Sequence, residues 1–291
     1  MKKQERTGAF CVIIAGICWG IIGLFTRQLN DAGFDSVQVT FFRNSFSALI
    51  LFIYLLGSDK GKLKIKIRDL WIFIGTGICS IAFFNICYFK AIEITSLSVA
   101  AVLLYTAPAM VMIMSSILFK EKITVKNSIA LLFAFAGCLF TTGLIGSDIK
   151  LEMMGILIGL GSGFGYALYS IFGSLAIRKY DTVTITFYTF LIASVGLLPL
   201  CKPMAMLSVL RAEPQQIFVG FMLATISTIL PFTCYTIGLK YLEAGKASIM
   251  AFIEPMVATI CGIVIFKEAM TASNAIGILL IFLSVILLNL P

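Results

Sequence analysis

YTAPAMVMIMSSILFKEKIT, the sequence of residues 105–124, returns 147 positions later as FIEPMVATICGIVIFKEAMT at residues 252–271. Both stretches place a proline fourth, continue with an apolar run and end with Phe-Lys-Glu followed by a threonine. The correspondence extends outward at the same spacing, because Gly16 aligns with Gly163 and Tyr88 aligns with Tyr235. A repeat of this length is too long for a solenoid. The sequence therefore predicts two copies of one unit, which we place at residues 1–147 and 148–291.

The composition predicts that both copies lie in a membrane. Hydrophobic residues make up 60% of the chain and charged residues 12%, whereas soluble domains carry about 25% charged residues. A helix that spans a bilayer needs about 20 apolar residues, and five segments in each copy qualify. They are residues 8–28, 37–56, 70–91, 97–119 and 125–144, and then 154–177, 183–201, 217–239, 247–266 and 272–290.

An odd number of spans in each copy predicts that the second copy is inverted in the membrane. The expected fold is an all-α polytopic membrane protein, with ten transmembrane helices arranged as two inverted five-helix repeats. Inverted repeats of this kind are typical of secondary transporters.

The distribution of lysine and arginine predicts the orientation. With a cytoplasmic N-terminus, the cytoplasmic side receives fifteen of these residues and the opposite side six, which favours cytoplasmic termini in an inner membrane. We interpret the net charge of +8 as loop charge and expect no nucleic-acid partner. The basic run from Lys60 to Arg68 is typical of an orientation signal that also contacts anionic lipid. A dedicated lipid site is the alternative.

The residue types that the chain lacks exclude several classes of function. The chain has no histidine, which removes imidazole metal sites, Ser-His catalysis and histidine proton relays. Its eight cysteines form no C-x-x-C pair and lie mostly in apolar runs, where a thiol behaves as a small hydrophobe. We therefore expect no cofactor and no metal. An intramembrane enzyme needs a cluster of acids, bases or metal ligands, and a sensor needs an appended domain, so both are weaker hypotheses.

Pro108 and Pro255 fall near the middle of the fourth and ninth predicted spans. Proline removes a backbone donor and frees a carbonyl, which a membrane helix tolerates beside a neighbour or a cavity. One such proline can be a simple kink. Two at matching places in inverted copies favour the repeat interface near the bilayer centre, where transporters bind substrate.

Glu254 and Arg43 are the charged residues that lie deepest in the predicted spans. Their counterparts in the other copy are the neutral Ala107 and Thr189. An acid at that depth costs on the order of 2.5–3.5 kcal/mol and faces the protein interior with a partner. Glu254 is either a protonated or hydrogen-bonded structural contact, a proton-coupling site, or an anchor for a substrate amine. For Arg43 a structural contact with a helix or a lipid phosphate is favoured, and a substrate carboxylate is the alternative.

Aromatic residues with a polar group lie inside the spans rather than at their rims. Lining a central cavity would satisfy the polar group and offer stacking surface to an organic solute, while plain packing is the alternative. Asn85, one turn before Tyr88, is a further wall residue. The candidate substrate-binding residues are therefore Trp19, Asn85, Tyr88, Tyr105, Tyr166, Tyr235 and Glu254, and the structural or gating candidates are Arg43, Pro108 and Pro255.

These residues give the chain its resemblance to a known family. The Trp19 region, Arg43 and the two blocks that end in Phe-Lys-Glu resemble EamA-type members of the drug/metabolite transporter superfamily, over essentially the whole length. The family often has glycine before the terminal glutamate, where this chain has Lys120 and Lys267.

The resemblance implies ten helices in two inverted repeats around a central cavity, lined from the first, third, fourth, sixth, eighth and ninth spans. It also implies export of small organic metabolites, often amino acids, by alternating access. We expect a small organic solute and membrane lipid as partners, with proton coupling through Glu254 and an uptake permease or facilitator as alternatives. The sequence does not determine the oligomeric state, and a monomer is compatible with the two-repeat architecture.

Overall fold

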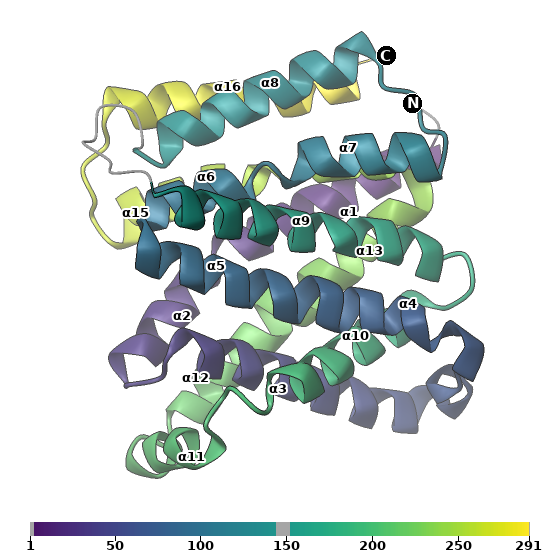
Figure 1. The fold of residues 1–291 in the computed structure, drawn as a ribbon, viewed down its shortest axis with the longest axis vertical. Helices are drawn as coiled ribbons and strands as arrows, with labels where there is room; N and C mark the ends of the chain where they lie inside the picture. The colour runs from purple at the N-terminus through teal and green to yellow at the C-terminus, as the bar shows by residue number, and fades with distance from the viewer. Residues whose placement is uncertain (1–2, 144–151, 291) are drawn as a thin grey trace.

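The computed structural model describes residues 3–143 and 152–290, and these ranges consist of helices joined by short connections (Figure 1). Within them, eight helical segments are long and apolar enough to cross a membrane. Two shorter apolar helices, Val125–Thr141 and Thr182–Leu197, stand where the fifth and seventh spans are predicted. The predicted all-helical membrane fold is confirmed.

The helices of the two copies follow one another in the same order. The first copy contains α1 (Lys3–Gly20), α2 (Ile22–Asp31), α3 (Ser36–Ser58), two short 3₁₀ turns (Lys60–Leu63 and Ile67–Asp69), α4 (Leu70–Ile74), a π-helical segment (Gly75–Ala82), α5 (Phe83–Ile94), α6 (Leu97–Leu104), α7 (Ala107–Leu118) and α8 (Val125–Thr141). The second contains α9 (Met153–Ala176), α10 (Thr182–Leu197), α11 (Pro203–Ala212), α12 (Gln216–Ala224), a π-helical segment (Thr225–Ile229), α13 (Leu230–Tyr241), α14 (Ala244–Met250), α15 (Ile253–Ile265) and α16 (Ala272–Asn289).

The copies use the same local signals to end one helix and begin the next. The Thr124 and Thr271 side chains cap α8 and α16, each accepting a hydrogen bond from the backbone N–H three residues later at 3.1 Å. Just before these caps, Lys120 and Lys267 have φ angles of 58° and 56°. This left-handed region disfavours residues with a Cβ. The glycine that EamA-type sequences often carry here would adopt it without strain.

The fourth and ninth spans are broken at matching places, between α6 and α7 and between α14 and α15. Pro108 and Pro255 therefore lie in the first turn of a new helix, where the missing N–H has no intrahelical partner to lose. Both prolines lie within their predicted spans, and the structure adds that the helix stops before each proline and begins again.

Helices of one copy pack against helices of the other in reciprocal pairs. α1 packs along α13, its counterpart α9 packs along α5, and α3 and α8 pack along their own counterparts α10 and α16. The reciprocity extends to single residues. A Cβ on Gly16 would lie 2.8 Å from Ile253, and one on Gly163 would lie 2.8 Å from Thr106, the counterpart of Ile253. Such reciprocal contacts define a two-fold relation.

Contacts between α8 and α16 show that this relation inverts the second copy. The Ser284 hydroxyl donates to the Ala130 carbonyl at 2.6 Å, and the Ser273 hydroxyl donates to the Phe140 carbonyl at 2.8 Å. The start of α16 therefore lies beside the end of α8, and the helices run antiparallel. Because they are counterparts, the two copies point in opposite directions, as the odd number of spans predicts.

α11 has no counterpart among the predicted elements. It is ten residues long, and a search for segments of about 20 apolar residues therefore passes over it. Its Met206, Val209 and Leu210 side chains pack against an apolar cluster that includes Leu29 and Phe42. The helix covers the end of the bundle where α2, α3 and α12 meet (Figure 1).

Candidate functional site

Glu254 lies in the first turn of α15, directly after the break in the ninth span. Its Oε2 accepts a hydrogen bond from the Tyr166 hydroxyl of α9 at 3.4 Å. Tyr105, at the matching break of the first copy, and Arg43 on α3 also lie near this carboxylate. Arg43 is buried, and among the described residues no ion pair within 4 Å joins it to Glu254. The space between the copies thus holds an acid, a base and two phenols.

An aromatic wall adjoins Glu254 and is built from α1, α9 and α13. The Trp19 ring lies 6.4 Å from the Tyr166 ring and 5.4 Å from the Tyr235 ring, measured between centroids. Phe232 packs edge-on against Trp19 at 5.2 Å, and Phe84 of α5 packs edge-on against Tyr166 at 5.5 Å. Edge-on pairs of this kind stabilise a fixed arrangement of rings. The wall therefore presents its ring surfaces in defined orientations.

The aromatic wall encloses a small cavity. Its free volume is about 10 Å³, which is room for about one water molecule. Its lining consists of Trp19, Ser80, Ile81, Phe84, Tyr166, Tyr169, Ser170, Phe232 and Tyr235. In this conformation the cavity has no room for an organic solute.

Two side-chain hydrogen bonds between α9 and α13 close one end of this cavity. The Ser170 and Tyr235 hydroxyls are 2.7 Å apart, and the Tyr169 and Thr236 hydroxyls are 2.8 Å apart. One turn further along both helices begins a cleft of about 490 Å³. It is lined by Phe119, Glu121, Ser174, Ile177, Arg178 and residues 239–243. The two bonds therefore separate the cavity from the cleft, and we call them the α9–α13 gate.

The cleft lies on the side of the bundle that holds both ends of the described chain, which we call the terminal side (Figure 1). Gly8 of α1 packs against Tyr241, and Lys126 donates a hydrogen bond to the Leu290 carbonyl. The opposite end, which holds Arg27 and Glu268, is the far side.

The far side has no equivalent of the gate, because Gly23, Ile22 and Phe89 stand where the gate has Ser170, Tyr169 and Thr236 and they carry no hydroxyl. At this place Ser170 corresponds to Gly23 and Tyr235 to Tyr88. A Cβ on Gly23 would meet no atom within 4 Å. Within the described residues, the Tyr88 hydroxyl makes no hydrogen bond, and its ring contacts only that of Phe89 among the aromatic pairs. The first span also breaks at Ile21, whereas α9 is continuous over the matching stretch.

A second pair of counterparts, Glu121 and Glu268, also differs between the two sides: the terminal-side residue bonds to the start of a helix, and the far-side residue pairs with an exposed arginine. The Glu121 carboxylate accepts hydrogen bonds from the backbone N–H groups of Ala244 and Gly245 at 2.9 and 3.2 Å. It thereby ties the end of α7 to the start of α14 on the terminal side. Burial raises the pKa of Glu243, in the loop just before α14, and the Glu121 charge raises it further.

Glu268 makes no such contact with the start of α6, which is capped instead by the Ser96 hydroxyl at 3.2 Å from the Val99 N–H. Its carboxylate pairs with Arg27 at 3.1 Å, and both side chains are more than half exposed. The Arg27 guanidinium also lies 4.0 Å from the Phe266 ring centroid. Exposed ion pairs contribute about 0–1 kcal/mol, so this far-side link is weaker than the amide contacts of Glu121.

The structure brings together some of the predicted site residues and separates others. Trp19 packs against both Tyr166 and Tyr235, and all three line the cavity. Asn85 is buried, donates to the Ile81 carbonyl at 2.7 Å and lies 3.5 Å from the Thr40 hydroxyl of α3. Asn85 and Tyr88 are absent from the cavity lining, and their part in substrate binding stays a prediction.

Sequence reasoning missed most of the other cavity residues. Tyr169 and Ser170 lie one turn after Tyr166, and Phe232 lies one turn before Tyr235. Residues three or four apart share one face of a helix. Including the residues one helical turn before and after each predicted aromatic residue would therefore have found Tyr169, Ser170 and Phe232.

Within residues 3–143 and 152–290, no group of three His, Cys, Asp or Glu side chains could hold a metal ion. Glu254 belongs to no such group among the described residues. Its nearby partners are phenols and a guanidinium. These groups suit a hydrogen-bonded organic solute or a proton.

Comparison with known proteins agrees with this architecture. The model of the EamA-like transporter family matches residues 6–143 and 153–290. An uncharacterized transporter of Archaeoglobus fulgidus is 30% identical over 277 residues, which cover 94% of this chain and 92% of the relative. The uncharacterized inner membrane transporter YicL of Salmonella typhimurium is 25% identical, and the match covers 99% of this chain and 96% of YicL.

A solved crystal structure is similar in fold alone, with a TM-score of 0.79 at 16% sequence identity, over 98% of this chain and 96% of that one. The family match covers both copies of the repeat, and its members are transporters rather than enzymes. The chain is a multi-pass membrane protein and belongs to the EamA-like transporter family.

Proposed function

We propose that the chain carries a small organic solute across the membrane by alternating access, through the space between its two copies. The meeting of the two broken helices at Glu254, beside Trp19, Tyr166 and Tyr235, is the observation that carries the proposal. Transporters with inverted repeats bind substrate where discontinuous helices meet at the repeat interface. The α9–α13 gate closes the terminal side and the space around Gly23 on the far side is open, which supports one half of such a cycle.

The charges of the site favour an amino acid or a related compound. Glu254 offers a carboxylate to an amine, and Arg43 offers a guanidinium to a carboxylate. The two do not form an ion pair with each other within 4 Å, which leaves both available to a zwitterion. Trp19 and Tyr166 offer ring surface to its apolar part.

Export from the cytoplasm is the direction we propose, with both termini cytoplasmic in an inner membrane. The excess of lysine and arginine in the loops of the terminal side supports this orientation. The resemblance to exporters of small metabolites supports the direction. Uptake or facilitated diffusion uses the same geometry, and measured flux distinguishes them.

The test begins with a ligand screen. Purified protein is heated with amino acids, amines and nucleobases, and a compound that binds the folded form raises its Tm. Flux of each hit is then measured in proteoliposomes. Solute-dependent, saturable flux is the expected result, and its absence for every stabilising compound would contradict the proposed function.

Glu254→Gln is expected to reduce this flux by about tenfold or more, because a hydrogen bond to a charged group contributes about 1.5–3 kcal/mol. Glu152→Gln is the matched control, since it makes the same change at an exposed position at the start of α9. Equal flux in the two variants would show that Glu254 takes no part in binding the solute.

Proton coupling through Glu254 is the finer alternative, and it predicts that flux depends on pH. The measurement is wild-type and Glu254→Gln flux over about three pH units around neutrality. Coupling predicts a pH dependence in the wild type that Glu254→Gln abolishes. Wild-type flux that does not change with pH rejects coupling and leaves Glu254 as a solute anchor.

A further inference from the structure

The connection between α3 and α4, residues 59–69, presents a row of cations on one face. Lys64 and Lys66 have extended backbone angles, and side chains alternate in extended chain. Lys64 and Lys66 are accordingly exposed, while Leu63 and Ile65 pack against buried apolar clusters. Lys60 and Arg68, in the flanking 3₁₀ turns, are exposed as well. We call Lys60, Lys64, Lys66 and Arg68 the basic face.

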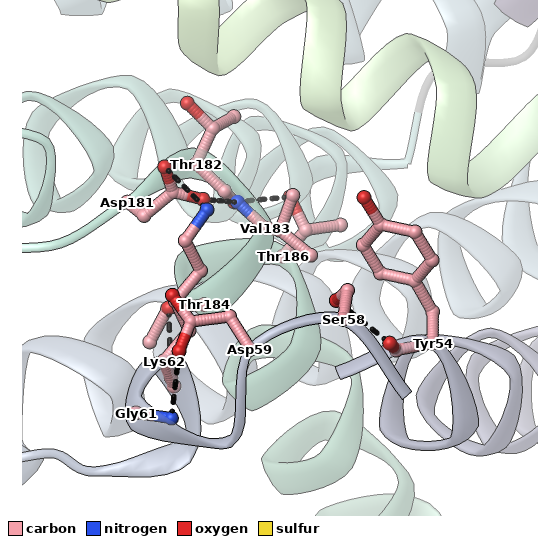
Figure 2. A network of polar contacts seen from close by, with 10 residues as sticks. All are labelled: Tyr54, Ser58, Asp59, Gly61, Lys62, Asp181, Thr182, Val183, Thr184 and Thr186. Atoms are coloured by element: carbon pink, nitrogen blue, oxygen red, sulfur yellow. Dashed lines mark hydrogen bonds and ion pairs between the residues drawn. The ribbon is translucent and has the colours of Figure 1, made fainter. Parts of the chain in front are cut away.

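The connection is fixed to the second copy by a network of polar contacts (Figure 2). The Thr184 hydroxyl donates to the Lys62 carbonyl at 2.8 Å, and the Lys62 ammonium lies 3.3 Å from the Asp181 carboxylate. Beyond the figure, the Tyr188 hydroxyl donates to the Leu63 carbonyl at 2.6 Å. The basic face is therefore held in a defined position rather than carried on a free loop.

The acids around the basic face are already engaged with other groups. Asp59 accepts from the Gly61 N–H at 2.9 Å, and Asp181 pairs with Lys62 (Figure 2). Asp69 is buried and contacts both Lys179 and the Tyr180 hydroxyl.

Among the described residues, no carboxylate lies within 4 Å of any cation of the basic face. These charges therefore remain for a partner outside the chain. Because the surrounding acids are held by other groups, turning a neighbouring side chain does not neutralise them.

An apolar stripe continues directly from the basic face along the third span. Ile67 is 88% exposed and Trp71 52% exposed, and Ile74 and Ile78 follow on the same surface. Residues at this three- to four-residue spacing form one face of a helix. A membrane helix with such a face contacts acyl chains, and Trp is favoured at the level of the headgroups.

We propose that the basic face binds the phosphate of anionic phospholipids, with the acyl chains lying on the stripe formed by Ile67, Trp71, Ile74 and Ile78. Cations placed immediately above a lipid-facing stripe match the two-part chemistry of a phospholipid. A soluble acidic partner would use the cations and leave the stripe without a role. Each lysine or arginine near an anionic membrane surface contributes about 1 kcal/mol, which is roughly a fivefold gain in affinity.

Lys64→Gln/Lys66→Gln/Arg68→Gln is the test variant, and Lys3→Gln/Arg6→Gln/Lys122→Gln is its matched control. The control removes three exposed cations from the terminal side, and none of them takes part in an ion pair among the described residues. Purified proteins are placed in nanodiscs of phosphatidylcholine with or without phosphatidylglycerol. Native mass spectrometry counts the bound lipids, and thermal unfolding gives Tm.

The wild type and the control are expected to retain phosphatidylglycerol in preference to phosphatidylcholine and to gain Tm from it. The test variant is expected to lose this preference by about tenfold or more. A Lys64→Arg/Lys66→Arg variant keeps the charge, so it is expected to retain the preference. This variant also shows whether the exposed positions tolerate substitution.

Three results would overturn the proposal. Equal loss in the test and control variants would show that net charge alone acts. Equal retention of the two lipids by the wild type would show that there is no site. A gain in Tm from glycerol phosphate in pure phosphatidylcholine nanodiscs, equal to that from the lipid, would assign the site to a soluble anion.

Discussion

The two halves of this protein share matching sequence motifs and differ at the place where each would open or close. On the terminal side, Ser170 and Tyr235 are hydrogen-bonded at 2.7 Å. On the far side, their counterparts Gly23 and Tyr88 make no such contact, and Gly23 faces open space. Part of this difference lies in the sequence, because Gly23, Ile22 and Phe89 stand where the second copy has Ser170, Tyr169 and Thr236 and lack their hydroxyls. The backbones differ as well, because the first span breaks at Ile21 whereas α9 is continuous.

The difference indicates how the other conformation is reached. If the first copy adopted the conformation of the second, and the second that of the first, the terminal side would open and the far side would close. The interactions involved are small enough for such an exchange. A neutral hydrogen bond contributes about 0.5–1.5 kcal/mol, and two states within a few kcal/mol of each other are both populated.

The largest expected effect separates Glu121 from Glu268. Glu121→Gln removes the charge from two hydrogen bonds to backbone amides and is expected to lower the free energy of unfolding by about 1.5–3 kcal/mol. Glu268→Gln removes an exposed ion pair and is expected to cost about 0–1 kcal/mol. Chemical unfolding in detergent measures both. An equal loss of unfolding free energy in the two variants would mean that the two carboxylates stabilise their sides of the protein equally.

An intermediate effect separates Tyr235 from Tyr88. Tyr235→Phe removes the hydrogen bond to Ser170 and is expected to cost about 0.5–1.5 kcal/mol. Tyr88→Phe, the same change at the counterpart position, is expected to leave the unfolding free energy unchanged, since its hydroxyl makes no hydrogen bond in the described chain. A larger loss for Tyr88→Phe than for Tyr235→Phe would reverse the assignment of the closed side.

The smallest expected effect concerns the lysine with left-handed backbone that both copies have before the last helix of the repeat. Lys120 and Lys267 both adopt left-handed backbone, which costs residues with a Cβ about 1–2 kcal/mol, while glycine loses more chain entropy on folding. Lys120→Gly and Lys267→Gly are each expected to stabilise the protein by up to about 1 kcal/mol. Thermal unfolding checks this, and a loss of Tm in either variant argues against strain at that position.

The sequence alone was sufficient to predict the fold class but not every helix. The repeated Phe-Lys-Glu blocks and the apolar segments predict two copies of a helical membrane unit, because periodicity and hydrophobicity depend on local residues. α11 was missed because ten residues do not resemble a span. The helix breaks before Pro108 and Pro255 were missed because a proline signals a disturbance and does not show on which side of it the helix stops.

The site was only partly predictable. Trp19, Tyr166, Tyr235 and Glu254 were predicted as site residues because aromatic and acidic residues deep in a span are unusual. The structure places the three aromatic residues around one cavity, with Tyr166 hydrogen-bonded to Glu254, and their part in substrate binding stays a prediction. The gate was not predicted. The sequence separates the copies there, with Ser170 against Gly23, but only the structure shows that the Ser170 and Tyr235 hydroxyls meet. Which copy is closed depends on the balance of many weak contacts between copies, and no local pattern encodes that balance.

The most direct test of alternating access measures two matched distances in one protein. Spin labels on cysteines at Ile177 and Lys240 report the terminal side, and labels at their counterparts Asn30 and Glu93 report the far side. A cysteine-depleted background carries either pair, and Tyr235→Phe with Thr236→Val weakens the gate. The account predicts that the 177–240 distance grows while the 30–93 distance shrinks. If both distances grow together, or if opening the terminal side leaves the far side unchanged, the two sides are not coupled and the account is contradicted.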